Sequence, residues 1–244
     1  MIVVNEVFGI EASEWAFSLI KKMTAKIEDF ETFAAKPCWD TFKLVLDELS
    51  LVRGVDAFCG QTRAVFVDDD EDRFVLKVQH SDNDEVDYCA SEAWAYQKAC
   101  DQNLGQFFAA IACVGKFENL SLYVMEKCDV DEDKNSSLSE KHYYNDWRAS
   151  NNLTDSEAAM EQFYDEVDGS EYQDTEGMLD FAATEWGYKD AQRVRVFLEL
   201  YQINDCHYGN WGWRDGELVI TDYAGFGVDI VKEAEGEKNN EEEK

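Results

Sequence analysis

The chain has 244 residues, of which 45% are hydrophobic and 14% aromatic, and its 53 acidic and 22 basic side chains give a net charge of −31. This length suits one large domain or two small lobes around a shared cleft. So acidic a surface repels nucleic-acid phosphates and anionic membranes, which argues against direct binding to either. It suits a solvated surface, a basic protein partner, or mimicry of nucleic acid towards a DNA-binding protein.

The cysteines and the first residues indicate a cytoplasmic protein. Seven Cys are present, an odd number, and none forms a Cys-x-x-Cys pair. We therefore expect reduced thiols rather than disulfides or a zinc site. The N-terminus has no basic region of the kind that begins a signal peptide, and no apolar run approaches the length of a membrane span.

Two helices are expected before the first strand. Apolar residues recur at helical spacing over 11–35. They are Trp15, Leu19, Met23 and Ile27. Pro37 breaks this helix, and 39–51 follows as a second one. We therefore expect a helical hairpin over 1–51, whose role is packing.

After these helices the apolar pattern changes to that of strands. Residues 55–58, 64–67 and 74–78 read as three strands joined by short turns, and the second turn is the acidic segment 68–72. Gly60 lies near the tip of the first turn. The three strands look like a sheet that covers a nucleotide, although a single glycine at the turn gives few positions for close approach of the backbone to a phosphate.

Lys77 lies inside the third apolar strand, where a buried ammonium needs a partner. Glu92 occurs fifteen residues later, within 88–96, which reads as a helix. A strand lysine oriented by a helix glutamate is the arrangement that places an ammonium on nucleotide phosphates. The alternative is an exposed lysine at a strand edge and an unrelated helical glutamate.

Two further strands are expected at 107–114 and 120–125, followed by a connecting segment that includes Glu126 and Cys128. Residues 129–139 are polar and acidic, and we expect a loop there. The rest, 140–202, reads as mainly helical, with an interruption near 168–170. Its last part, 191–202, has the clearest apolar stripe.

The stretch that follows carries the chemistry. Asp205 is followed five positions later by Asn210, and Asp222 comes twelve positions beyond that, after the apolar run 218–220. Arg214–Glu217 contains the turn signal Asp-Gly and reads as a hairpin tip. Phosphoryl transfer needs one carboxylate to orient a hydroxyl proton, then a carboxamide and a second carboxylate to hold Mg²⁺. An exposed acidic loop after a helix is the alternative.

In this order and spacing, residues 52–228 resemble the protein-kinase superfamily. Asp205 and Asn210 match the catalytic-loop pattern Asp-x-x-x-x-Asn, and Asp222 stands at the Asp of Asp-Phe-Gly, although Tyr-Ala follows it here. The resemblance implies ATP and Mg²⁺ as cofactors, with Asn210 and Asp222 as metal ligands. It further implies contacts to ATP from Gly60, Lys77, Glu92, Glu126 and Cys128, the last two at the adenine.

Within that superfamily the chain is similar to the early host-shutoff Ser/Thr protein kinases of short-tailed lytic bacteriophages. The shared features are the N-terminal helical segment, the Gly-x-x-x-Ala-x-aromatic form that starts at Gly60, the Asp-x-His-x-Gly-Asn form of 205–210, and Ile-Thr-Asp at 220–222. The resemblance implies phosphorylation of host proteins in the host cytoplasm and help in shutting off host transcription. RNA polymerase or other basic nucleic-acid-binding proteins are the implied partners.

The expected fold class is α+β. We expect a two-lobed protein-kinase-like fold with an antiparallel β-sheet N-lobe, a mainly helical reduced C-lobe and the N-terminal helical hairpin. The expected parts are the helical segment 1–51, the N-lobe and hinge 52–128, the C-lobe 129–230, and an acidic tail 231–244. Few residues follow Asp222, which leaves little room for the segment that positions peptide substrates in most kinases.

Two other functions stay open. A kinase-like acidic protein of weak or absent activity would inhibit a basic nucleic-acid-binding host protein by charge. A small-molecule phosphotransferase is suggested by the form His207-x-Gly209-Asn210.

Overall fold

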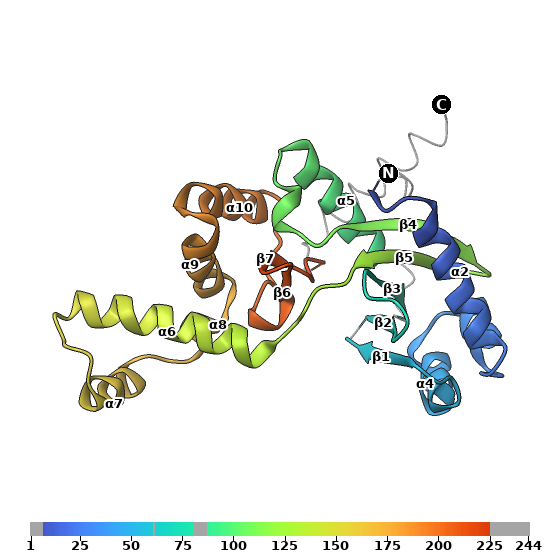
Figure 1. Ribbon diagram of the computed structural model, residues 1–244, viewed down its shortest axis with the longest axis horizontal. Coiled ribbons are helices and arrows are strands. Elements are labelled where there is room, and N and C mark those ends of the chain that lie inside the picture. Colours follow the sequence, from blue (N-terminus) through green and yellow to red (C-terminus); the bar gives the residue numbers. More distant parts are fainter. Residues whose placement is uncertain (1–6, 61, 81–86, 225–244) are drawn as a thin grey trace. The chain divides into compact units, whose positions relative to one another are not determined.

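The structure, a computed structural model, describes residues 7–60, 62–80 and 87–224, and it has an α+β architecture (Figure 1). The chain forms two compact units. Among the described residues, the first unit comprises those up to 105 and 109–127, and the second comprises 106–108 and 128–224. The predicted acidic tail, 231–244, lies outside the described residues. No helix in the described ranges is long and apolar enough to cross a membrane.

The first unit is built on a five-stranded antiparallel sheet in the order β1-β2-β3-β5-β4. The strands are β1 (Val55–Cys59), β2 (Arg63–Asp68), β3 (Phe74–Gln79), β4 (Ile111–Phe117) and β5 (Leu120–Glu126). Side chains alternate between the two faces of each strand, so β3 sends Leu76 to one face and Lys77 to the other. The three predicted strands before residue 80 and the predicted strand at 120–125 are confirmed.

The strand predicted at 107–114 is wrong at its start, because β4 begins at Ile111. Gly105–Phe107 is a 3₁₀ turn, and Phe107 and Phe108 belong to the second unit. There the ring of Phe107 lies 4.7 Å from Trp186 and the ring of Phe108 lies 5.4 Å from Phe197. The apolar run in the sequence is therefore divided between two cores.

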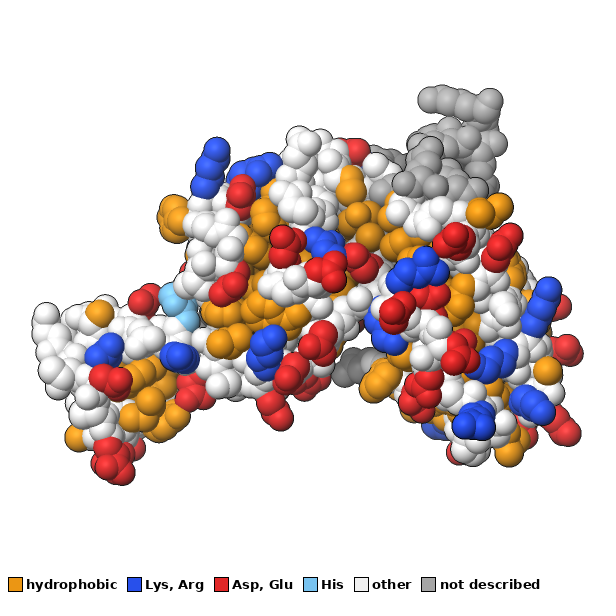
Figure 2. All heavy atoms as spheres, in the orientation of Figure 1, with side chains coloured by type: hydrophobic (Ala, Val, Ile, Leu, Met, Phe, Trp, Pro, Cys, Tyr) orange, Lys and Arg blue, Asp and Glu red, His pale blue; other side chains and the backbone are white. Residues whose placement is uncertain are grey.

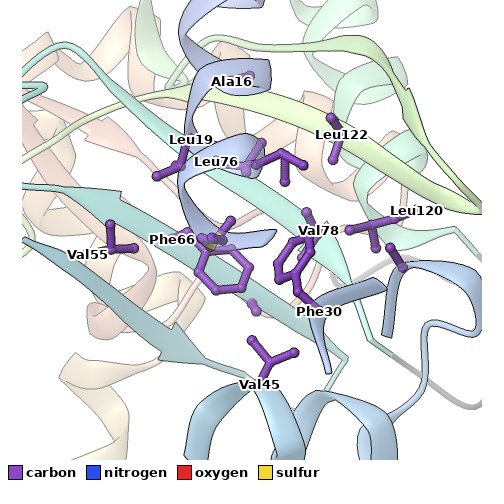
Figure 3. Packing of buried hydrophobic residues seen from close by; sticks show 14 of the residues in the cluster. Ala16, Leu19, Phe30, Val45, Val55, Phe66, Leu76, Val78, Leu120 and Leu122 are labelled. Atoms are coloured by element: carbon purple, nitrogen blue, oxygen red, sulfur yellow. The ribbon is translucent and has the colours of Figure 1, made fainter. Parts of the chain in front are cut away.

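Helices α2, α3 and α4 cover one face of the sheet. Their bounds are Ile10–Thr24, Phe30–Ala35 and Trp39–Glu48, and a 3₁₀ turn at Leu49–Leu51 follows. Figure 3 shows Leu19, Phe30 and Val45 of these helices meeting Phe66 and Leu76 of the sheet. Burial of this apolar surface is the main stabilising term for the unit.

The predicted two-helix hairpin is wrong in its first half, because 11–35 forms two helices with a break at 25–29. The hydroxyl of Thr24 donates to the carbonyl of Ile20 at 3.0 Å and lies 3.2 Å from that of Lys21. Such side-chain bonds compete with the backbone bonds that would continue the helix. The apolar spacing persists to the buried Ile27 without a continuous helix beneath it.

Helix α5 (Tyr88–Asp101) packs against the other face of the sheet, along β3 and β4. Asp87 caps it by accepting the N–H of Ala90 at 2.9 Å. Its buried side chains are mostly small. They are Cys89, Ala90, Ser91, Glu92, Ala93, Ala95 and Ala99. Small side chains let the helix lie close to the sheet, and β3 is consequently buried on both faces from Phe74 to Val78.

The second unit is mainly helical. Its elements are α6 (Glu132–Ser150), α7 (Glu157–Glu166), α8 (Ser170–Gln173), α9 (Thr175–Trp186), α10 (Tyr188–Leu200) and the strands β6 (Trp211–Arg214) and β7 (Glu217–Ile220). Aromatic rings form its core: Trp186 stacks on Trp211 at 5.3 Å, and Tyr223 meets Phe108 edge-on at 5.1 Å. Tyr144, Phe163 and Tyr172 form a second, smaller cluster between α6, α7 and α8.

The loop predicted at 129–139 is wrong, because α6 begins at Glu132. Asp131 caps the helix by accepting the N–H of Lys134 at 2.8 Å. The inward-facing positions of its first turns are polar: Asn135 is fully buried, and Ser139 is buried and donates to the carbonyl of Tyr172. A helix whose buried side chains are polar shows no apolar period, so the segment reads as a loop.

The β6–β7 hairpin is confirmed where the Asp-Gly signal predicted it. Asp215 and Gly216 have φ values of 51° and 85°, the two left-handed residues of a type I′ turn. Such a turn fixes the register, which pairs Trp211 with Ile220. The predicted helical interruption near 168–170 is also confirmed, since α7 ends at Glu166 and α8 begins at Ser170.

Phe66→Ala should destabilise the first unit by about 3–5 kcal/mol, because it opens a cavity at a fully buried ring. The matched control is Phe58→Ala, on the neighbouring strand, where the ring is 64% exposed. That change should stay within about 0.5 kcal/mol. Urea unfolding of both variants measures the difference, and equal costs would contradict the core described here.

Candidate functional site

The predicted ion pair between Lys77 and Glu92 is present in the first unit. Lys77 Nζ lies 2.6 Å from Glu92 Oε2, and the two side chains are 3% and 0% exposed. Arg63 Nη1 lies 3.4 Å from the same oxygen. Two cations from adjacent strands therefore meet one carboxylate from α5.

The fold explains why Lys77 needs this partner. It lies on the α5 face of β3, with Val65 and Tyr123 opposite it in the flanking strands and Met125 Sδ 3.9 Å from its ammonium. These neighbours are largely apolar, and an unpaired ammonium among them would be costly. Glu92 compensates that charge, and the short contact holds the ammonium at one position.

Tyr123 and Cys89 border this pair, and both remain protonated at neutral pH. Burial, and then the nearby Asp87 carboxylate, raises the pKa of Tyr123 well above its usual value, and its hydroxyl donates to Asp87 Oδ2 at 3.0 Å. Burial is likewise the first cause that raises the pKa of the Cys89 thiol. The thiol is therefore a packing group rather than a nucleophile.

Gly60 lies where it was predicted, at the end of β1. Its N–H donates to the carbonyl of Arg63 at 2.9 Å and closes the turn into β2. A Cβ at Gly60 would have that carbonyl oxygen as its nearest neighbour, at 3.7 Å. A side chain at position 60 would therefore fit without a clash, and the glycine leaves that space open. Gln61 lies outside the described residues.

Arg63 is a residue that the sequence analysis missed as part of the site. It begins β2 directly after the Gly60 turn, and its side chain is 14% exposed. A cation so close to a glycine turn and so little exposed is the signal that could have identified it. Its contact with Glu92 joins the turn to the Lys77 pair.

The segment predicted to hold adenine passes from the first unit to the second after Lys127. The N–H of Glu126 donates to Ala110 O, and the N–H of Lys127 donates to Arg73 O, both at 2.8 Å. The Glu126 carboxylate accepts the N–H of Ala110 at 3.2 Å. A ligand contact at this segment would therefore use carbonyl oxygens or Cys128.

In the second unit the β6–β7 hairpin brings Asn210 and Asp222 together. The N–H groups of Thr221 and Asp222 donate to the carbonyl of Asn210 at 2.8 and 3.3 Å. Both residues sit at the open end of the hairpin and are half-buried. The strand register therefore brings the backbones of these two predicted residues together.

Asp205 lies on the same loop with its side chain 67% exposed. Its carbonyl accepts a hydrogen bond from Asn210 Nδ2, so one side of the Asn210 carboxamide holds the loop closed. Asn210 Oδ1 is then the atom of that side chain suited to a metal ion.

His207 and Gly209 complete the loop. His207 Nδ1 accepts the N–H of Gly209 at 3.1 Å, so the proton of the neutral ring lies on Nε2, which is 4.0 Å from Asp205 Oδ1. A Cβ at Gly209 would lie 3.0 Å from His207 Cε1. A side chain at 209 would therefore press on the His207 ring, which would have to shift by a few tenths of an ångström.

A metal site made only of protein side chains is not apparent. In the described ranges, no group of three or more His, Cys, Asp or Glu side chains is arranged to hold a metal ion. Asn210 and Asp222 offer one amide oxygen and one carboxylate. Mg²⁺ in phosphate-transferring enzymes commonly binds one or two carboxylates together with waters and substrate phosphates.

Lys77→Met should lower the free energy of unfolding by about 3 kcal/mol, because it removes the nearest cation from the buried Glu92. The double variant Lys77→Met/Glu92→Leu should recover only part of that loss, since apolar residues replace the pair but Arg63 loses its contact with Glu92. Lys43→Met is the control: its contact with Asp40 joins side chains that are 52% and 86% exposed, and its loss should cost below about 1 kcal/mol. Urea unfolding measures all three.

Comparisons of the chain with protein-family models, curated proteins and solved structures found no significant match. Two sets of side chains therefore carry the functional argument. The first unit contributes Lys77 with Glu92 and Arg63, and the second contributes Asp205, Asn210 and Asp222.

Proposed function

We propose that this chain is an ATP- and Mg²⁺-dependent Ser/Thr protein kinase of protein-kinase-like fold. In this proposal it is of the phage early type, phosphorylates host proteins and helps to shut off host transcription. The single observation that carries the proposal is the buried pair of Lys77 and Glu92, at 2.6 Å on the inner face of a β-strand and a helix.

The buried pair favours a function because it is a poor way to gain stability. Taking two charges out of water costs several kcal/mol per ion, and their attraction repays this cost only in part. An apolar pair at positions 77 and 92 would stabilise the sheet at least as well. A fixed ammonium beside the Gly60 turn is what a nucleotide phosphate needs.

The proposed roles divide between the two units. Lys77 would contact the nucleotide phosphates, with Glu92 fixing its position and Arg63 adding a second cation nearby. Asp205 would act on the substrate hydroxyl, and Asn210 and Asp222 would hold the metal ion. Catalysis would consist mainly of positioning and of charge neutralisation.

The residues present suit Mg²⁺, because Asn210 Oδ1 and the Asp222 carboxylate are oxygen donors on two residues whose backbones are joined by a hydrogen bond at the open end of the hairpin. When bound, the ion would neutralise charge on the phosphate oxygens. The chain's own contribution is to hold these two side chains at one end of a register-fixed hairpin.

Phosphate transfer at this site would form one bond and break another. The substrate hydroxyl oxygen forms a bond to the γ-phosphorus, and its proton passes to a carboxylate oxygen of Asp205. The bond between the γ-phosphorus and the β–γ bridging oxygen breaks, and ADP leaves with that electron pair. His207 Nε2–H, 4.0 Å from the carboxylate, would help to orient it.

Protein hydroxyls suit the site as substrates because the Asp205 carboxylate is 67% exposed. A side chain on another protein can reach an exposed carboxylate. A metabolite would have to be held by contacts that enclose it, and an exposed carboxylate offers fewer of these than a buried one. A small-molecule acceptor therefore remains the second choice for the same chemistry.

Asp205→Ala should lower phosphate transfer from labelled ATP with Mg²⁺ by about 10²–10⁴-fold, because the proton acceptor is lost. Binding of ATP should be retained, since Asp205 does not hold the phosphates. The assay uses the purified chain with and without a host-cell lysate, and it scores label in protein and in small molecules separately. Label that appears only in small molecules would reverse the choice of substrate.

Asp165→Ala is the matched control for that experiment. Asp165 is an exposed carboxylate of α7, outside the loop that carries Asp205. It changes net charge equally and should leave transfer unchanged. Full transfer by Asp205→Ala would remove that residue from the mechanism.

A second candidate function rests on the net charge of −31. An acidic surface could occupy a basic site on a nucleic-acid-binding protein without any catalysis. Figure 2 shows Asp and Glu side chains spread over the visible face with Lys and Arg between them, rather than joined in one continuous patch. That distribution suits a solvated surface better than mimicry of a nucleic-acid strand.

If charge recognition is nevertheless the function, Asp222→Ala should bind a basic partner as tightly as the wild type. Binding should weaken steeply between low and physiological salt, because exposed charges are screened beyond about 10 Å at 0.1 M salt. Pull-down from host lysate at two salt concentrations, with wild type and Asp222→Ala, measures both effects. Capture that ignores salt would exclude a charge-driven inhibitor.

A further inference from the structure

The loop that carries Asp205 and Asn210 exposes much of its polar surface, yet its backbone is held at nearly every residue. Asp205 and His207 have side chains that are 67% and 49% exposed. Cys206 and Trp211 supply buried anchors, and the indole N–H of Trp211 donates to the carbonyl of Cys206 at 2.8 Å. Four further backbone groups, at Asn204, Cys206, Tyr208 and Trp211, find partners on two upstream helices.

Thr175 holds the backbone on both sides of Asp205. Its hydroxyl donates to the carbonyl of Asn204 at 3.1 Å and accepts the N–H of Cys206 at 3.0 Å. A hydroxyl can give and accept at once, and here both bonds go to peptide groups that flank one residue. Thr175 is the first residue of α9, a helix anchored in the core by Met178 and Leu179.

Asn135 holds the backbone on both sides of Asn210. Its Nδ2 donates to the carbonyls of Tyr208 and Trp211 at 3.1 and 2.9 Å, and its Oδ1 accepts the indole N–H of Trp213 at 2.9 Å. All three hydrogen bonds of this fully buried carboxamide therefore go to the loop and to β6. No other neutral side chain of that size offers two donors and one acceptor in this geometry.

Burial of the Asn135 carboxamide costs more than a purely structural role requires. A buried polar side chain pays for desolvation, and an apolar residue of similar shape can replace a satisfied polar one with little loss of stability. The hydrogen bonds of Asn135 and Thr175 fix the backbone of a loop whose exposed side chains hold it only weakly. A phosphoryl-transfer site needs its reacting groups to be positioned within a fraction of an ångström.

We propose that Asn135 and Thr175 are positioning residues, which fix the backbone on either side of Asn210 and Asp205 from helices α6 and α9. This inference rests on the proposed phosphotransferase function and extends it to two residues outside the loop. Thr175 sets where the Asp205 carboxylate meets the substrate hydroxyl. Asn135 sets where the Asn210 carboxamide meets the metal ion.

The test is steady-state transfer from labelled ATP by Thr175→Val, Thr175→Ser and Thr184→Val. Valine keeps the shape of threonine and loses both hydrogen bonds, so kcat should fall by about tenfold to a hundredfold, with KM for ATP within about twofold of wild type. Thr175→Ser restores a hydroxyl and should recover most of the lost kcat. Thr184→Val is the control on the same helix, where the hydroxyl bonds Phe181 O instead of the loop.

Asn135→Asp provides the second arm, because it replaces the amide donor by an oxygen that faces two carbonyls. Transfer should fall further than in Thr175→Val. If this variant does not fold, the threonine series still decides the matter. Hydrogen exchange at the Cys206 amide should speed up in Thr175→Val and stay unchanged in Thr184→Val.

The possible outcomes distinguish a failure of the positioning roles from a failure of the proposed kinase function. A wild type that transfers no phosphate, with every acceptor tried, overturns the proposed function and this inference with it. An active wild type with unchanged kcat in Thr175→Val overturns the inference alone. A variant that loses thermal stability but keeps wild-type kcat per folded molecule shows that Thr175 is structural only.

Discussion

Burial of β3 on both faces is the constraint on which the first unit depends. One face must accept the apolar side chains of α2, α3 and α4, and the other must accept α5 at close range. Leu76 satisfies the first requirement in the ordinary way. Lys77 is charged and cannot simply pack against an apolar surface. The fold tolerates it because the small residues of α5 let the helix approach closely enough for Glu92 to reach the ammonium. The helix thus has two tasks, packing and charge compensation.

The second unit follows the opposite strategy. Its candidate residues are exposed, and precision comes from the backbone beneath them. The hairpin supplies one half of that precision by pairing, and the buried Asn135 and the half-buried Thr175 supply the other by hydrogen bonding. Charge is buried in one unit, whereas polarity without charge is buried in the other. Both devices leave one functional group in a defined position.

The sequence predicts the elements whose side chains alternate or recur with a clear period. The three strands before residue 80, the Lys77–Glu92 pair and the Asp-Gly turn at 215–216 belong to this class. The start of α6 does not, because Asn135 and Ser139 face inward as polar residues and leave no apolar stripe. Arg63 and Thr175 were missed since their roles depend on contacts with residues about thirty positions away.

The type I′ turn has a consequence for how such chains can diverge. Because side chains alternate along a strand, one residue added to a single arm of the β6–β7 hairpin would rotate the side chains beyond it to the opposite face. Residues added in matched pairs, one to each arm, would only extend the tip away from Asn210 and Asp222. The number of residues between Asn210 and Asp222 can therefore change by two at a time. A search pattern for distant relatives should hold the two residues constant and leave the length between them open in that way.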